Sequence, residues 1–545
     1  MVEDDLDRVR RILEKLEQVR ARGLFCFGSE KHGFRLNPPC SEAELEAFEK
    51  KHNIRLPIDY RTFLKHAGNG GAGPYYGLLP LEKCDGFRGW LADVDPDENF
   101  LARPCPLYPE LKRTPEWRDQ FGAVCPYQGT ISVAYQGCTH ISQLIVTGPH
   151  ANKIVDVDAE NHAPYMVHEP DFLAWYERWL DELLGGYKMN EFGFGPRGGE
   201  QDFFRILSDP QSSDEFKAEA AQAFCRLPQL SVYARARIQE YLRHSIAGVR
   251  SGACATVCLF EVKEAEEEVA QLLDDPSPEV RQQAVHTAMK FDSARWASLV
   301  HRRLWEDPSD DVARTAFSSL EKAGALPKNE MLRIMEQSPS GDRRYVAASS
   351  VEWTPEDEGL LIRLLSDTHA YVRLCATQGL GKINARLAVP QLVDLLAKEK
   401  DEDVIASILQ RLGELGNRSV APILMHWTDA SDDHHRLDAI QSLIKLGDDR
   451  AIPIVKRMLK ENRKPGVRLD HSGRMKTFNV LPMKVILPIC LRQSPNQALR
   501  DLARKRWPWW VWIIVISLGI FLAEWMRSTH GLPVTGNKTE IGTNK

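Results

Sequence analysis

The sequence predicts an α+β N-terminal domain, followed by an all-α solenoid and then by one C-terminal transmembrane helix. Residues 1–188 mix amphipathic helical segments with short β-prone segments, which is typical of an α+β domain. Residues 202–462 carry a repeat with a period near 31, which is typical of a solenoid of helical hairpins. An apolar run at 507–526 has the length of a membrane span.

The first domain is expected to begin and end with helices. Apolar residues recur on one stripe of residues 3–22, which predicts an amphipathic helix. Ser41 and Glu44 fit a capping box and therefore start a second helix. Pro57 is expected as the first residue of a third helix, a position at which proline is tolerated. Asp171 is a candidate N-cap for the last helix of the domain.

Four β-prone segments lie between these helices, at 124–127, 130–135, 141–147 and 153–157. They supply the β part of the predicted α+β class. An acidic cluster, Asp156, Asp158 and Glu160, lies at the end of the last segment. We interpret this cluster as part of a solvated loop, with a negatively charged docking face for a basic protein as the alternative.

A Pro-rich, acidic insert occupies residues 83–121. It contains a group of four carboxylates, Asp93, Asp95, Asp97 and Glu98. Two interpretations are open, because such residues can be a solvated loop or a negatively charged docking face for a basic protein. The second interpretation makes these four residues the candidate partner-binding site.

The order of the pieces, together with a set of mostly apolar or turn-forming positions, points to a known type of domain. These positions are Leu36-Asn37-Pro38-Pro39, Leu56-Pro57, Asp59-Tyr60, Phe63-Leu64, Asn69, Gly137-Cys138, Leu144-Ile145-Val146, Gly148-Pro149, Phe172, Trp175-Tyr176 and Trp179-Leu180. With them, residues of about 30 to 185, without the insert, resemble the SUKH superfamily, which includes fungal cell-wall-assembly regulators and many bacterial immunity proteins. These positions are mostly apolar or turn-forming, so they report the fold. The resemblance implies a domain that binds other proteins and does not catalyse a reaction.

A V-R-x-x-A-like pattern marks each copy of the repeat and opens a helix. The markers lie at positions 216, 249, 280, 312, 343, 372, 404 and 435, at intervals of 29 to 33 residues. The Ala of the marker and an apolar or small residue eight positions after the start of the marker share one helical face. The small Ala lets neighbouring helices approach closely. Eight copies in phase resemble the short type of HEAT repeat. This resemblance implies a stacked α-solenoid, a class that typically binds partners.

Residues 189–201 separate the two regions. The stretch from Gly193 to Gly198 reads GxGxxG, which is the pattern of a dinucleotide-binding loop. No predicted strand precedes it, however, and it contains Pro196. We therefore predict a Gly-rich linker here.

The C-terminal region predicts a membrane anchor. Residues 461–506 hold 11 Lys and Arg against 3 Asp and Glu, which suits a basic juxtamembrane segment at 463–506. A span at 507–526 and a short polar tail at 527–545 follow. The positive-inside rule then predicts a single-pass membrane protein with everything before the span in the cytoplasm. The tryptophans expected at the membrane surface are Trp507, Trp509, Trp510, Trp512 and Trp525.

The composition narrows the classes of function. Residues 1–190 contain 22 Lys and Arg against 29 Asp and Glu, so this region is not expected to bind nucleic acid. The 11 cysteines include no CxxC pair, and no catalytic-triad order, phosphate loop or HExxH pattern is present. We therefore predict no catalytic residue, no cofactor and no metal site.

Three hypotheses about function are consistent with these observations. The first is a membrane-tethered, protein-binding scaffold, for example an immunity protein that captures a basic partner or a toxin domain through its SUKH-like domain. The second is a housekeeping adaptor associated with the cell envelope. The third is an enzyme whose site does not show in a single sequence. All three leave the oligomeric state open.

Overall fold

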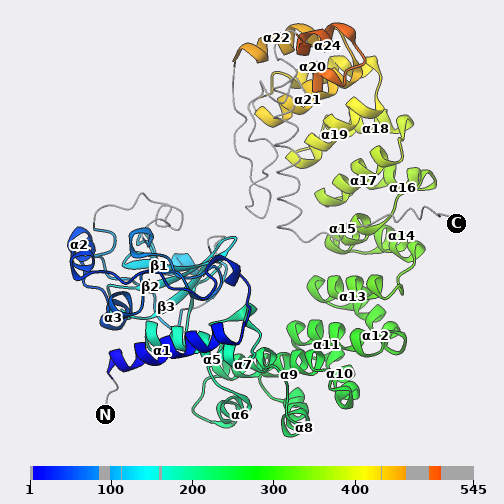
Figure 1. Cartoon of the computed structure of the whole chain (residues 1–545). Coiled ribbons are helices and arrows are strands. Elements are labelled where there is room, and N and C mark those ends of the chain that lie inside the picture. The colour runs from blue at the N-terminus through cyan, green and yellow to red at the C-terminus, as the bar shows by residue number, and fades with distance from the viewer. Residues whose placement is uncertain are drawn as a thin grey trace, which may run out of the picture. The chain divides into compact units, whose positions relative to one another are not determined.

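The computed structural model describes residues 4–84, 99–111, 113–158, 162–430, 432–461 and 490–504. The chain divides into two compact units, Met1–Pro327 and Lys328–Lys545. The first unit contains an α+β domain and the first helices of a solenoid. The second unit contains the later solenoid helices (Figure 1).

The α+β domain is built around one antiparallel sheet. Its helices are α1 (Asp5–Ala21), α2 (Glu42–His52), α3 (Ile58–His66) and α5 (Phe172–Leu184). Its strands are β1 (Thr130–Gly137), β2 (His140–Ile145), β3 (Ile154–Asp158) and β4 (Tyr165–Met166), in the order β1-β2-β3-β4. In the register of the sheet Ile131 lies opposite Leu144 and Ile141 lies opposite Val157. The predicted α+β class is confirmed.

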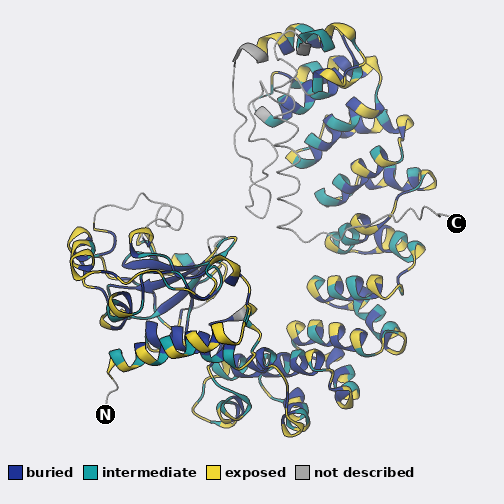
Figure 2. Ribbon diagram, in the orientation of Figure 1, coloured by how far each residue is buried: buried dark blue, intermediate teal, exposed yellow. Residues whose placement is uncertain are grey.

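Both faces of this sheet are covered (Figure 2). Successive strand residues point to opposite faces, so Ile131 and Leu144 pack with apolar residues of α1, α3 and α5 on one face. On the other face Ile141 and Val157 pack with Trp117, which is fully buried. Trp117 belongs to the predicted insert, so the described end of the insert forms the cover of the second face.

The helix ends follow the predicted capping chemistry. The Ser41 side chain accepts from the Glu44 amide at 3.3 Å, while Glu44 accepts from the Ser41 amide at 2.8 Å, so the capping box is confirmed. Asp171 caps α5 by accepting from the Ala174 amide at 2.8 Å. The third helix begins one residue later than predicted, because Pro57 is its N-cap.

One predicted strand is wrong. Residues 124–127 form turns, and Val124 is exposed while Tyr127 packs against Trp117 with ring centroids 6.1 Å apart. Pro126 lies within this segment and has no amide hydrogen for a sheet partner. Tyr127 of this segment therefore packs into the core on the Trp117 side of the sheet, and the segment forms no strand.

The solenoid consists of paired helices in both units (Figure 1). The helices that begin at the eight sequence markers are α7 (Asp214–Ala223), α9 (Ala247–Leu259), α11 (Pro278–Phe291), α13 (Asp310–Lys322), α15 (Gly341–Ser350), α17 (Ala370–Lys382), α19 (Glu402–Leu415) and α21 (Asp433–Leu446). The other described helices are α6 (Glu200–Ser208), α8 (Val232–Ile238), α10 (Glu266–Gln271), α12 (Ser293–Glu306), α14 (Lys328–Gln337), α16 (Glu358–Leu364), α18 (Val389–Leu396), α20 (Ala421–Trp427), α22 (Ala451–Glu461) and α24 (Gln497–Arg504). The marker alanines Ala253, Ala284 and Ala376 are fully buried. The predicted helical solenoid is confirmed.

The arginines at the second position of the marker pattern form ion pairs with the turns that follow in the chain. Arg281 of α11 forms two hydrogen bonds of 2.8 Å with Asp307, which lies in the turn before α13. The same guanidinium donates to the carbonyl oxygen of Asp275, at 2.8 Å, in the turn before its own helix. Equivalent pairs join Arg250 to Asp275 in the first unit, and Arg344 to Asp367 and Arg373 to Glu399 in the second. Each arginine therefore bridges two turns.

The structure contradicts the predicted transmembrane helix and, with it, the single-pass membrane localisation. Within the described ranges, no helix is both long enough and apolar enough to cross a bilayer. A crossing needs about 20 apolar residues, whereas α1, the longest described helix, has 17 residues and many charged side chains. The predicted span at 507–526, with Trp507, Trp509, Trp510, Trp512 and Trp525, lies outside the described residues.

Candidate partner-binding cleft

A buried ion-pair network joins the α+β domain to the first solenoid helices. Arg178 of α5 is fully buried and pairs with Glu169 at 2.8 Å and with Glu182 at 2.7 Å. Glu182 also accepts a hydrogen bond of 2.6 Å from Arg226, which follows α7. The two arginines and the two glutamates balance in charge. Removal of one partner from such a buried pair costs about 3 to 5 kcal/mol, so the network holds α5 against the solenoid.

The Gly-rich segment packs into this junction. Arg178 donates to the carbonyl oxygens of Phe194 and Gly195, at 3.2 and 3.0 Å. Gly193 adopts a φ of +94°, and a Cβ at this position would lie 3.0 Å from the Asp156 carboxylate. A glycine therefore allows the backbone to pass close to Asp156. The predicted linker is a packed part of the first unit.

A cleft of about 860 Å³ opens beside the network, between the sheet and helices α7, α9 and α11. Four aromatic residues line it, Tyr75, Tyr165, Phe192 and Phe194. The described charged residues of its lining are the acids Asp156, Glu215, Glu219 and Glu279 and the base Arg113. Carboxylates thus outnumber cations, and aromatic faces lie beside them, which is an environment that favours a cationic ligand.

Asp156 lies on the sheet side of the cleft, in β3. Its Oδ1 accepts from the Ser142 hydroxyl at 2.8 Å and from the Gln136 amide at 2.7 Å. Burial raises the pKa of Asp156 to about 7, because the cost of desolvation outweighs these hydrogen bonds, which lower it. Among the described residues, no Lys or Arg side chain forms an ion pair with Asp156. A carboxyl group that titrates near neutrality in a cleft is a candidate functional group.

Arg113 shows how the cleft holds a cation. Its guanidinium lies 4.5 Å from the centroid of the Tyr165 ring. It also lies 3.4 Å from Glu219 and 3.7 Å from Glu215. Glu219 is buried and is hydrogen-bonded to His168 at 2.5 Å. Arg113 therefore supplies the counter-charge for Glu219, while the side chain of Glu215 stays largely exposed.

The predicted docking residues Asp93, Asp95, Asp97 and Glu98 lie outside the described residues. They therefore remain a sequence-based prediction, without a place in the structure.

The interpretation of the second acidic cluster as a solvated loop is wrong for Asp156 and Asp158. Strand β3 extends to Asp158, which is 8% exposed, so both residues belong to the strand and Asp156 is only partly exposed. Asp156 is not among the four residues predicted as the partner-binding site. The available signal was its position between two strand valines, Val155 and Val157.

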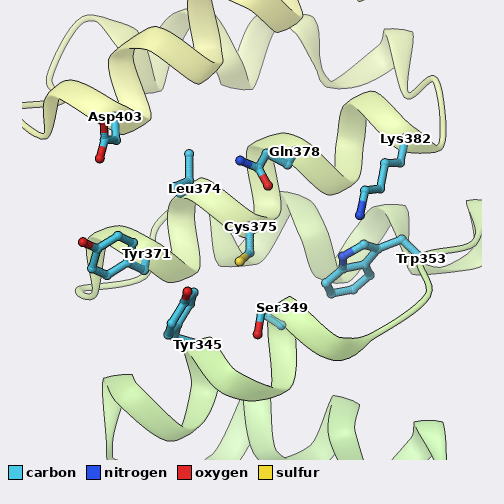
Figure 3. Close-up of a pocket in the computed structure, with 10 residues that line it drawn as sticks. Tyr345, Ser349, Trp353, Tyr371, Leu374, Cys375, Gln378, Lys382 and Asp403 are labelled. Carbon is cyan, nitrogen blue, oxygen red and sulfur yellow. The ribbon is translucent and has the colours of Figure 1, made fainter. Parts of the chain in front are cut away.

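The second unit has a smaller hollow of about 400 Å³ (Figure 3). The aromatic residues that line it are Tyr345, Trp353 and Tyr371. Helix α15 has 10 residues and α17 has 13, so the chain leaves α15 early and the Trp353 ring packs beside α17. The described charged residues of this lining, Lys382 and Asp403, balance each other. This hollow therefore gives no charge preference for a ligand.

Several solved structures are similar to part of the chain. Human deoxyhypusine hydroxylase is 18% identical, with a TM-score of 0.20, and the match covers 45% of this chain and 96% of that one. YibA of E. coli is 18% identical, with a TM-score of 0.34 and coverage of 46% and 93%. The complex of CpcE and CpcF of the Nostoc phycocyanin lyase is 17% identical, with a TM-score of 0.21 and coverage of 42% and 94%.

Family comparisons match both parts of the chain. The SMI1 / KNR4 family (SUKH-1) matches residues 39–117, and HEAT repeats match residues 234–321, 329–412 and 389–470. No curated protein gives a significant match. The first match is shorter than the predicted range and includes residues 83–117 of the insert. The chain thus combines an SMI1/KNR4-type (SUKH-1) domain with HEAT repeats, as its sequence resemblances predicted.

Proposed function

We propose that this protein is a protein-binding scaffold whose partner enters the cleft between the sheet and helix α7. The observation that carries the proposal is the cleft itself, an aromatic-lined space of about 860 Å³ with surplus carboxylates. SUKH and HEAT families are binding and scaffold types, which supports a partner that is a protein.

The charges of the cleft favour binding over a purely structural role. The neighbouring network of Arg178, Arg226, Glu169 and Glu182 balances in charge, as expected of a structural junction. The cleft beside it leaves Asp156 without an ion-pair partner in the described part of the chain. A surface that only holds two domains together has no need of this surplus charge.

The partner that we propose is a basic protein domain, and a toxin domain is the specific case that the SUKH resemblance suggests. Negative clefts attract basic surfaces and accelerate their association. In that case the protein acts as an immunity protein, and its expression should protect cells against the toxin.

Site-specific photo-crosslinking in the cells that express the protein tests the proposal. A photo-reactive amino acid replaces Gln222, which lines the cleft, or Glu264, which is exposed on η7 (Lys263–Ala265) and does not line it. We expect a discrete protein adduct from position 222 that is absent from position 264. Adducts of equal yield from both positions, or none from position 222, would show that the cleft does not bind a protein.

A further inference from the structure

We infer that the cleft binds a cationic side chain, an arginine or a lysine, that the partner protein inserts beside Asp156. This inference rests on the proposed function and specifies the chemistry of its ligand.

The distribution of charge around Asp156 supports a cation from outside the chain. Arg178 exerts an electrostatic effect on Asp156 that lowers its pKa, but Glu169 and Glu182 already pair with Arg178. Arg113 is engaged with Glu219 and Glu215. The negative charge of Asp156 therefore remains without a counter-charge among the described residues, in a space that is open to a ligand. A bound cation would stabilise the ionised carboxylate and so offset the cost of its burial.

The hydrogen-bond geometry leaves one oxygen of Asp156 available. Ser142 and Gln136 both donate to Oδ1. A Cβ at Gly193 would lie 3.0 Å from Oδ2, so the missing side chain leaves space beside this oxygen. A guanidinium or an ammonium group could donate to Oδ2 while the two existing hydrogen bonds persist, since a carboxylate oxygen pair accepts several donors.

The cleft already holds one cationic side chain of the protein itself, that of Arg113. Arg113 places its guanidinium over the Tyr165 ring and against Glu219, which combines an aromatic face with a carboxylate. Asp156 lines the same cleft as three further aromatic residues, Tyr75, Phe192 and Phe194. The long apolar stem of an arginine or lysine would pack on these rings while its charged head reaches the carboxylate.

Binding selections on the full-length protein test this inference. The probe is a phage-displayed library of random dodecapeptides, selected on the wild-type protein. We expect the enriched peptides to share an Arg or a Lys. A selected peptide should bind Asp156→Asn at least about tenfold more weakly, because a charge-assisted hydrogen bond is lost. The matched control is Glu264→Gln, which removes an exposed carboxylate outside the cleft and should not change the affinity.

Further measurements make the outcome decisive. Asparagine keeps the acceptor for Ser142 and Gln136, so Asp156→Asn should fold, which circular dichroism verifies. Replacement of the peptide's Arg or Lys by norleucine should weaken binding to the wild type by a similar factor. Enriched peptides without a cation, unchanged affinity of Asp156→Asn, or binding of free spermidine as tight as that of the peptide would overturn the inference. If one of these results is found together with a specific crosslink from position 222, the cationic ligand is refuted but protein binding in the cleft is not. If one of these results is found and no specific crosslink forms, both proposals are refuted.

Discussion

Asp156→Asn should stabilise the protein at about pH 8 and have little effect at about pH 4. The pKa of Asp156 is about 7 in the folded protein, against an ordinary value of 3.8. Between these values the folded state keeps a proton that the unfolded state has lost, so stability falls as the pH rises through this window. This difference in pKa corresponds to about 4 kcal/mol, which is the upper limit of the expected gain in stability. Asparagine should give this gain in stability because its side chain is uncharged and its oxygen can still accept hydrogen bonds from Ser142 and Gln136.

Urea unfolding of the full-length protein at the two pH values measures this effect, with tryptophan fluorescence as the signal. The expected result is a higher midpoint for Asp156→Asn at about pH 8 and similar midpoints at about pH 4. Glu264→Gln should match the wild type at both. A variant that is less stable than the wild type at about pH 8 would refute the reasoning, since it would mean that the ionised carboxylate contributes to folding. A stabilised variant with weaker peptide binding would identify Asp156 as a residue retained for binding.

Three further predictions concern packing. Ala284→Asp places a charge in a fully buried helix contact and should lower the free energy of unfolding by several kcal/mol in urea titrations. The control Gln282→Asp, at an exposed position on the same helix, should change this free energy by less than about 1 kcal/mol. Arg281→Met removes two hydrogen bonds of 2.8 Å from the buried Asp307, which keeps Arg303 at 3.5 Å, and should cost up to about 3 to 5 kcal/mol. Arg281→Met combined with Asp307→Leu should recover most of this loss. Arg178→Met should open the junction and speed proteolytic cleavage at residues 193–198, and equal cleavage in the exposed-site control Arg205→Met would contradict the proposed role of Arg178.

The elements that depend on local patterns could be predicted from the sequence. The eight markers gave the positions of the main solenoid helices because the period of small and apolar residues directly reflects helix packing. Ser41 and Asp171 gave two helix starts because capping is a contact within four residues. The strand predicted at 124–127 is wrong because the apolar composition of this segment suits either a strand or a turn that packs into a core.

The cleft could not be predicted because its walls come from distant parts of the chain. Gln136 and Asp156 belong to the sheet, Phe192 to the Gly-rich segment and Glu219 to α7. Only the folded chain brings them together. The raised pKa of Asp156 likewise depends on burial by these segments, so a sequence pattern would show only another acidic residue near the end of a strand.

The most direct test of the cationic-ligand cleft is a double-mutant cycle between Asp156→Asn and a selected peptide in which norleucine replaces the Arg or Lys. Isothermal titration of the four pairs gives the coupling free energy between the two charges. We expect a coupling of about 1.5 to 3 kcal/mol, the range of a hydrogen bond to a charged group. Independent losses, with a coupling indistinguishable from zero, would show that the peptide's cation does not contact Asp156 and would contradict the proposed mode of binding.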